Sequence, residues 1–468
     1  MARRVRFQAD AATLNELQRG RSMARSNFAR KGSWAFVLCC WLVFVWLPAQ
    51  EMQAQPVPSG LEFLVNESTT GSQLRPSVAS TPAGAFVVTW ENPADSVDKR
   101  FFSASGVAVG GDIEVGGASA GATASPAIDR NADGDIAVAW RRLEASAMSI
   151  RMKRFDSSGS AVAMEMEVNV ITTGDRSAPA VALSDSGLAM VTWRDDFSGD
   201  NEIYGRIYDS AGGSVGPFVV NETTTGEQLM PAVANIEGAD RFIVTWAGPD
   251  AESNGVYARL VDSTGSPVGA DLAANSAAAG AQSEPDVAAS DEGFVVSWTS
   301  DYSLETDADG TSVQARRFTT SGASIGEQMQ VNTETTGDQN RPAVAMDGDD
   351  GFTVVWRDES GTEALKGTTV LITGRRFNPP PPPPPRFGDF GLPNNLGVGS
   401  FGTAFTVTSA GLPDEPDVSD DLNGNFVVVW QATGSEDAEE IYGRRYNLAL
   451  FTDGFESGDV SAWDAAVP

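Results

Sequence analysis

The chain has 468 residues, a formal charge of −31, no histidine and only two cysteines, which are adjacent near the N-terminus. This composition excludes Ser-His-Asp and Cys-His nucleophiles, and it excludes zinc, haem and iron–sulfur sites that need His or Cys ligands. Because nucleic acids and anionic membranes favour basic surfaces, the acidic chain is not expected to bind either. Carboxylate chemistry, oxygen-ligated cations such as calcium and surface recognition remain.

Residues 1–54 predict a secretory signal peptide with a long basic n-region. A basic segment precedes an apolar run over residues 34–48, and small residues at Ala49 and Ala54 offer cleavage sites. The run is shorter than the roughly 20 residues that cross a bilayer, so we expect a cleaved signal and no membrane span in the mature chain. Met23 is an alternative start. Cleavage after Ala54 would leave 24 Lys and Arg against 60 Asp and Glu.

A motif that runs from a proline to a tryptophan recurs seven times after the signal. The proline lies 13 to 15 residues before the tryptophan in every copy. The copies begin at Pro76, Pro126, Pro179, Pro231, Pro285, Pro342 and Pro416, and they end at Trp90, Trp140, Trp193, Trp246, Trp298, Trp356 and Trp430. A repeat of about 50 residues is typical of solenoids, propellers and arrays.

Each period offers four short strands that are rich in Val, Ile, Phe and Tyr and are separated by Gly, Asp and Ser clusters. We therefore predict an all-β fold, a seven-bladed β-propeller of four-stranded blades over residues 58–450. The first period has a spare strand, residues 61–66, and the last period lacks one. The N-terminal strand should thus close the last blade and give a monomeric ring. A string of β-sandwiches and a β-solenoid are the alternatives, but each period is short for a sandwich.

Two features that recur once per blade are interpreted as structural. The seven tryptophans should fill the space between neighbouring blades. The third strands carry an arginine each, and we expect it to stack on a tryptophan and meet a carboxylate. These arginines are Arg100, Arg154, Arg206, Arg259, Arg316, Arg375 and Arg444.

Two segments depart from the repeat. Residues 378–402 contain a run of seven prolines, which favours a stiff polyproline II rod that projects from the ring as a docking ligand or as a tolerated insertion. Residues 451–468 form a C-terminal tail outside the repeats.

Two acidic strings are candidate metal sites. Asp129, Asn131 and Asp133 have the spacing of a calcium loop, Gly134 and Asp135 follow, and the string is similar to the short calcium loops of integrin-type FG-GAP propellers. Asn, Asp and Gly also form plain hairpin turns, which is the alternative for this segment. The second candidate is formed by Asp307 and Asp309. Calcium is the one cofactor that the sequence suggests.

The repeat pattern "VNxTTxGxQ…PxVA…FVVxW…IYGxRF" resembles tandem repeats of secreted bacterial surface proteins, including RTX-type adhesins. Residues 220–234 and 331–356 match it best, and the resemblance covers roughly residues 61–446. It implies an extracellular setting and a binding or structural role, and it has no catalytic residues to transfer. The tail over residues 451–463 resembles a C-terminal ending of exported proteins in Gram-negative bacteria, which implies sorting or anchoring; a disordered end and a strand packed on the ring are the alternatives.

The loops after the tryptophans are long and acidic, and they share one face of the predicted ring. We therefore expect a secreted, non-catalytic recognition or structural module at the surface of a Gram-negative bacterium, which binds a protein or a glycan through these loops. The alternative is a calcium-dependent, carboxylate-based enzyme that acts on glycans, either a glycoside hydrolase or a lyase.

Overall fold

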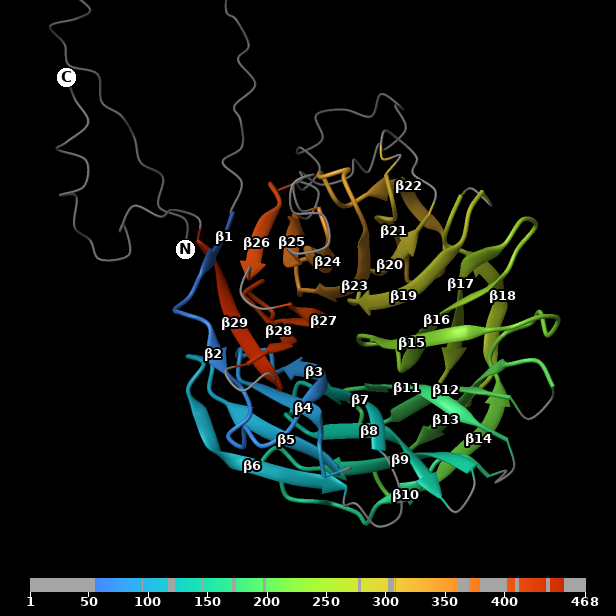
Figure 1. Cartoon of the computed structure of the whole chain (residues 1–468). Helices are drawn as coiled ribbons and strands as arrows, with labels where there is room; N and C mark the ends of the chain where they lie inside the picture. The colour runs from blue at the N-terminus through green and yellow to red at the C-terminus, as the bar shows by residue number, and fades with distance from the viewer. Residues whose placement is uncertain are drawn as a thin grey trace, which may run out of the picture. The chain divides into compact units, whose positions relative to one another are not determined.

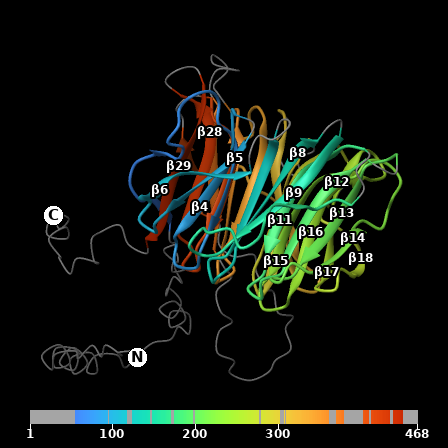
Figure 2. The same cartoon turned by 90° about the horizontal axis from the view of Figure 1, so that it is seen from below.

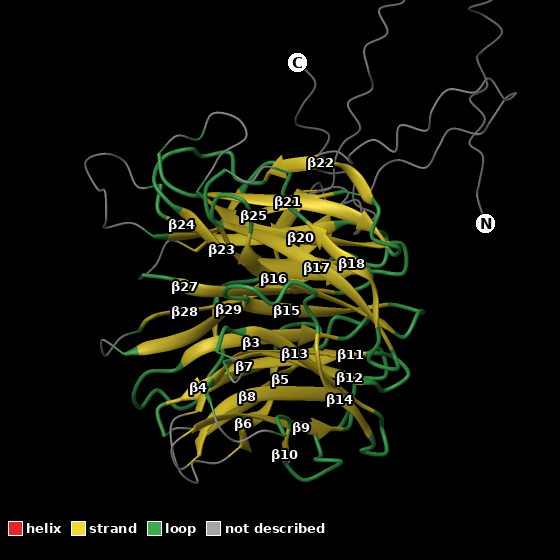
Figure 3. Ribbon diagram, turned by 90° about the vertical axis from the view of Figure 1, so that its right-hand side faces the viewer, coloured by secondary structure: helices red, strands yellow, loops and turns green. Residues whose placement is uncertain are grey.

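The computed structural model describes residues 55–449, except 95, 117–122, 145–146, 171–173, 197–198, 277–278, 302–306, 308, 361–369, 379–401, 409–411 and 435–437. In this part of the chain, every regular element is a β-strand (Figure 3). None of the described residues forms a helix that is long and apolar enough to cross a membrane. The predicted signal, most of the proline-rich segment and the C-terminal tail lie outside the described residues.

Seven antiparallel sheets surround a central axis, as the sequence predicts, and the fold is a seven-bladed β-propeller (Figures 1 and 2). Blade 1 contains β3 (Leu74–Ser80), β4 (Phe86–Asn92), β5 (Ser96–Phe102) and β6 (Ala108–Gly116). Blade 2 contains β7 (Thr123–Arg130), β8 (Ile136–Glu144), β9 (Ala147–Phe155) and β10 (Met166–Glu167). Blade 3 contains β11 (Arg176–Leu183), β12 (Ala189–Asp195), β13 (Glu202–Tyr208) and β14 (Ser214–Val219).

The remaining blades repeat this order. Blade 4 contains β15 (Leu229–Ile236), β16 (Arg241–Pro249), β17 (Asn254–Asp262) and β18 (Pro267–Ala273). Blade 5 contains β19 (Gln282–Ala289), β20 (Gly293–Ser300), β21 (Ser312–Thr319) and β22 (Ser324–Gln330). Blade 6 contains β23 (Gln339–Met346), β24 (Phe352–Asp358), β25 (Leu371–Phe377) and β26 (Phe405–Thr408). Blade 7 contains β27 (Asp414–Asp420), β28 (Phe426–Thr433) and β29 (Glu439–Ala449).

The N-terminal strand closes blade 7, which confirms that prediction. Two short strands, β1 (Gln55–Pro58) and β2 (Phe63–Leu64), pair antiparallel with the same C-terminal strand, β29. Phe63 lies opposite Gly443, and the Val65 N–H donates to the Ile441 carbonyl at 2.8 Å. The paired segment begins at Gln55, slightly before the predicted start at residue 58.

The seven tryptophans of the repeat are almost completely buried, with at most 1% of each exposed. Trp246 of blade 4 packs in one cluster with Ile203 and Val220 of blade 3, so it fills the space between the two blades. Its Nε1–H donates to Gln228 at 3.0 Å. The tryptophans therefore contribute to stability by burying aromatic area between blades.

One cation per blade fastens the third strand to the neighbouring blade. Its side chain donates to a carbonyl at or just after the end of the preceding outer strand, at 2.7–3.2 Å. The donors are Arg100, Lys153, Arg206, Arg259, Arg316, Arg375 and Arg444.

The prediction was wrong at one of these positions and in one detail. Lys153, not Arg154, occupies the position in blade 2, and Arg154 donates to the Asp209 and Gly187 carbonyls instead. The strand register explains the difference. Lys153 lies opposite Val138, and each of the other six cations lies opposite the equivalent valine of its own blade. Five of the arginines also lie over the Phe or Tyr two residues later rather than over a tryptophan.

The residue before each repeat proline adopts a left-handed backbone conformation. Seven non-glycine residues share φ values of 48–53°, and they are Arg75, Ser125, Ala178, Met230, Glu284, Arg341 and Glu415. This conformation costs about 1 kcal/mol per residue, so the surrounding bulge in each innermost strand must hold it in place. Seven bulges at one level bring these residues to the same face of the ring.

Candidate functional site

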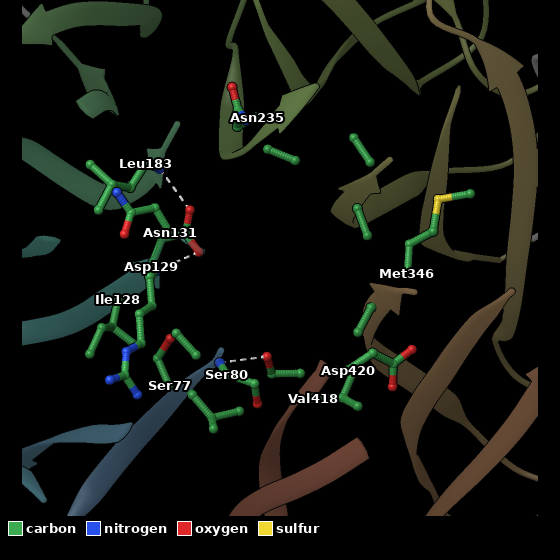
Figure 4. Close-up of a pocket in the computed structure, with 18 of the residues that line it drawn as sticks. Ser77, Ser80, Ile128, Asp129, Asn131, Leu183, Asn235, Met346, Val418 and Asp420 are labelled. Carbon is green, nitrogen blue, oxygen red and sulfur yellow. Dashed lines mark hydrogen bonds between the residues drawn. The ribbon is translucent and has the colours of Figure 1, made fainter. Parts of the chain in front are cut away.

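The innermost strands enclose a cavity of about 390 Å³ on the axis of the ring (Figure 4). All seven innermost strands contribute to its wall, mainly through small apolar residues such as Ala127, Ala180 and Ala288. Asp129, Asp286 and Asp417, which come from three different blades and which we call the lumen aspartates, also line it, together with Asp420 and Asp421. The Pro-to-Trp hairpin turns surround one end of this cavity, where Asp185 and Glu237 add further negative charge.

Each of the three lumen aspartates connects two blades. Asp286 accepts from the Val344 N–H at 2.8 Å, and Asp417 accepts from the Val78 N–H at 2.8 Å. Asp129 makes the same contact one pleat further along, with the Leu183 N–H at 2.7 Å (Figure 4). These N–H groups belong to innermost strands, whose inner edges have no strand partner, so the aspartates satisfy donors that the sheets leave free.

The environment of these carboxyls favours their protonated form. Burial raises the pKa of Asp129 and Asp286 to about 7 and the pKa of Asp417 to about 6, although backbone N–H donors act in the opposite direction. Perturbed carboxyls in a cavity are candidates for function. Here their hydrogen bonds between blades give them a structural role.

A buried ion-pair cluster lies between blades 6 and 7. The Arg376 guanidinium donates to Asp420 at 2.9 Å and also to Asp347. All three side chains are at most 4% exposed. Burial raises the pKa of Asp420 to about 8, an effect that Arg376 only partly offsets. Asp347 also accepts from the Gly351 N–H, so the acidic turn of the sixth repeat is a stabilised hairpin.

The first candidate metal string forms a hairpin turn beside the cavity. Asn131 Oδ1 accepts from the Asp135 N–H at 2.8 Å, and Gly134 has a φ of +88°. Asp129 faces the lumen, whereas Asp133 is exposed to solvent. The structure therefore brings Asp129 and Asn131 to one cavity and leaves Asp133 outside it.

The second candidate pair lies on the opposite face. Asp307 is buried and accepts from the Asn332 amide at 3.0 Å, and burial raises its pKa. Asp309 is exposed and lies near the Gly337 N–H. Among the described residues, no group of three or more His, Cys, Asp or Glu side chains is placed to hold a metal ion. Calcium binding at either string stays a prediction.

A cluster of accessible charges lies where the innermost strands begin. Arg341 Nη1 lies 2.7 Å from Asp414 Oδ1 and 2.8 Å from Glu415 Oε1, and its Nε lies 3.9 Å from Glu284. The four side chains are 30–39% exposed, so solvent reaches them. Arg341, Glu415 and Glu284 are three of the seven left-handed residues before the prolines. The bulges therefore assemble this cluster, which we call the Arg341 cluster.

The carboxylates of the Arg341 cluster differ in their surroundings. Asp414 has a second cation nearby, because Arg357 Nε lies 3.4 Å from its Oδ1. Burial raises the pKa of Glu415, and Arg341 lowers it to a smaller extent. Glu284 is held in place by the Thr299 hydroxyl at 2.8 Å and by the Arg341 N–H at 3.0 Å.

The distances within the cluster limit the separation of two carboxylates. Asp414 Oδ1 and Glu415 Oε1 bind the same nitrogen atom of Arg341, so these oxygens lie at most about 5.5 Å apart. This upper bound does not exceed the roughly 5–5.5 Å that separates the paired carboxyls of retaining glycosidases. A carboxyl with a raised pKa next to an ionised carboxylate can serve as acid and nucleophile, respectively.

No protein-family model matches the chain, and no curated protein matches its sequence. Its fold is similar to those of solved structures at low sequence identity. An ulvan lyase of polysaccharide lyase family PL25, bound to -[GlcA(1-4)Rha3S]-, shares 9% identity and a TM-score of 0.52, over 83% of this chain and 95% of the lyase.

Two further structures cover most of the ring. A protein of unknown function from Dyadobacter fermentans shares 10% identity and a TM-score of 0.49, over 84% of this chain and 99% of that protein. A GH93 α-L-arabinofuranosidase of Fusarium graminearum shares 12% identity and a TM-score of 0.43, over 70% and 98% of the two chains. At 9% identity, the similarity to the ulvan lyase establishes the shared fold alone.

The expectation of a non-catalytic recognition or structural module was wrong. The ulvan lyase, which has a stated activity and a TM-score above 0.5, favours the glycan-active alternative over that expectation. The seven-fold repeat and the adhesin-like motif suggested a non-catalytic module. Neither feature contains information about residues that occur in a single blade. Glu415 and Asp414 do not stand out in the sequence, because only the fold brings them to an arginine more than 70 positions earlier.

Proposed function

We propose that this protein is a glycoside hydrolase that acts through the Arg341 cluster. The observation that carries the proposal is the pair Asp414 and Glu415, two accessible carboxylates at most about 5.5 Å apart in different environments. The propeller fold shared with a glycan lyase supports it. The predicted signal peptide would deliver such an enzyme to extracellular glycans.

The proposed chemistry has two steps. Glu415, whose pKa is raised, donates its proton to the glycosidic oxygen while the bond from this oxygen to the anomeric carbon breaks. The Asp414 carboxylate attacks the anomeric carbon, and a covalent glycosyl ester forms as the leaving sugar departs. In the second step, Glu415 removes a proton from water, and the resulting hydroxide displaces Asp414 from the sugar. Arg341 positions both carboxylates.

The test uses the full chain and two conservative variants. Glu415→Gln should lower kcat on natural glycans by about 10²–10⁴-fold, because it removes the general acid. It should retain more activity on nitrophenyl glycosides, whose leaving group needs little protonation. Asp414→Asn should abolish turnover of both kinds of substrate. Asp349→Asn, at an exposed turn of the opposite face, is the matched control.

Reducing ends and product stereochemistry are the readouts. Retention of the anomeric configuration is expected from the short separation of the carboxylates. Full activity of both variants would overturn the assignment. So would an unsaturated uronate product, which lyases form and which is detected by its ultraviolet absorbance.

A further inference from the structure

Resting on the proposed function, we propose that the glycan cleaved at the Arg341 cluster carries no carboxylate or sulfate groups. Three arginines lie in or beside the cluster, namely Arg341, Arg75 and Arg357, and each of them already faces a carboxylate of the protein. A sulfated or uronate-rich glycan would need an uncompensated cation at this place, since guanidinium groups are the usual partners of such anions.

Arg75 is the first of these arginines. It lies close enough to Glu415 to influence its charge, but its Nη1 lies 2.6 Å from Glu91 Oε2. Glu91 is only 16% exposed, so the pair is partly shielded from water and its attraction is less screened than at an open surface. The charge of Arg75 is therefore compensated before any substrate arrives.

Arg341 and Arg357 are compensated as well. Arg341 faces Asp414, Glu415 and Glu284, while Arg357 pairs with Glu359 and lies near Asp414. Three arginines thus face five carboxylates, which are Asp414, Glu415, Glu284, Glu91 and Glu359. The net charge of these side chains is therefore negative, without counting the rest of the protein.

The whole chain strengthens this local excess. Its formal charge is −31. A field of one sign over a concave surface repels ligands of that sign and changes association by about 10–10³-fold. In this respect the proposed substrate differs from the carboxylate- and sulfate-bearing glycan bound by the ulvan lyase.

The first experiment measures cleavage by the full chain on two sets of glycans. Uncharged arabinan, xylan, galactan and β-glucan are compared with polygalacturonate, alginate and ulvan at low ionic strength. We expect kcat/KM on at least one uncharged glycan to exceed the value on every anionic glycan by at least about tenfold. Comparable turnover of an anionic glycan would overturn the inference, whereas no turnover of any glycan would contradict the proposed hydrolase itself.

The second experiment changes the charge without touching the catalytic pair. Glu91→Gln and Glu359→Gln together remove the partners of Arg75 and Arg357, while Asp349→Gln neutralises a distant surface acid as a control. The probe is a galacturonate oligosaccharide, measured as an inhibitor of uncharged-glycan cleavage. We expect the double variant to bind this probe about tenfold more tightly than wild type at low salt, with the difference reduced at 0.5 M NaCl. Equal inhibition of wild type and double variant would contradict the inference.

Discussion

The three lumen aspartates should make the protein more stable in mild acid than at neutral pH. Their pKa values in the folded chain, about 6 for Asp417 and about 7 for Asp129 and Asp286, lie above the ordinary value of 3.8. Between pH 4 and 7 the folded state therefore binds more protons than the unfolded state. The free energy of unfolding then falls as the pH rises through this window, and it stops falling once the carboxyls are ionised.

The size of the effect follows from the same values. A shift from 3.8 to about 6 at Asp417 corresponds to about 3 kcal/mol, at 1.36 kcal/mol per pKa unit. These residues are only partly buried, so solvent screening applies, and we take about 1.5 kcal/mol per site and about 4.5 kcal/mol for all three. With an unfolding entropy of about 2.1 cal/mol/K per residue over roughly 400 residues, the melting temperature should be about 5 °C higher at pH 5 than at pH 8.

Differential scanning calorimetry of wild type and of Asp286→Asn/Asp417→Asn separates this effect from the general charge repulsion of an acidic chain. The amide imitates the protonated carboxyl, so the variant should match wild type at pH 5 and melt about 3 °C higher at pH 8. A variant that melts below wild type at pH 8, or one with the same pH dependence, would refute the reasoning.

Three further predictions concern single features of the ring. Arg259→Met should lower the free energy of unfolding by about 1–3 kcal/mol in urea titrations, because it leaves the Val220 carbonyl without its donor; no change would contradict its role between blades. Lys99 is fully buried, and burial lowers its pKa to about 7. Lys99→Met should therefore raise the melting temperature at pH 7, with a smaller gain near pH 10. A lower melting temperature of the variant at pH 7 would count against this. Calcium and chelator should give melting temperatures within about 1 °C of each other, because the oxygens of Asp129 and Asn131 already accept backbone N–H groups; a larger rise would establish a metal site.

The blade count and the closing strand could be predicted because they depend on a pattern repeated seven times. The short strands rich in Val, Ile, Phe and Tyr, the spacing from proline to tryptophan and the surplus strand at residues 61–66 all indicate one ring. The strand register at the cation of blade 2 could not be predicted from this pattern. Lys153 and Arg154 are adjacent cations, and only strand pairing decides which of them faces the preceding blade.

The candidate site was less predictable for a physical reason. Glu284, Arg341 and Glu415 occupy equivalent positions in three blades. The same position holds Ser125, Ala178 and Met230 in three other blades, so no single period shows a charge cluster. The left-handed conformation before a proline is also disfavoured for ordinary residues, and the sequence has no glycine there to indicate it. The sequence predicts function on the acidic loops of this face, whereas the candidate pair Asp414 and Glu415 lies where the innermost strands begin.

The pairing of β1 and β2 with β29 also sets the order in which the molecule can be completed. Phe63 and Gly443 are partners, although nearly the whole ring separates them along the chain. During synthesis the first strands emerge long before β29 exists, so blade 7 must be the last sheet to form, and its closure must overcome the entropy of a very long loop. Until then both ends of the arc expose unpaired strand edges. If the chain is exported from its N-terminus, as the sequence predicts, the ring cannot close until the C-terminal strand β29 has also crossed the membrane.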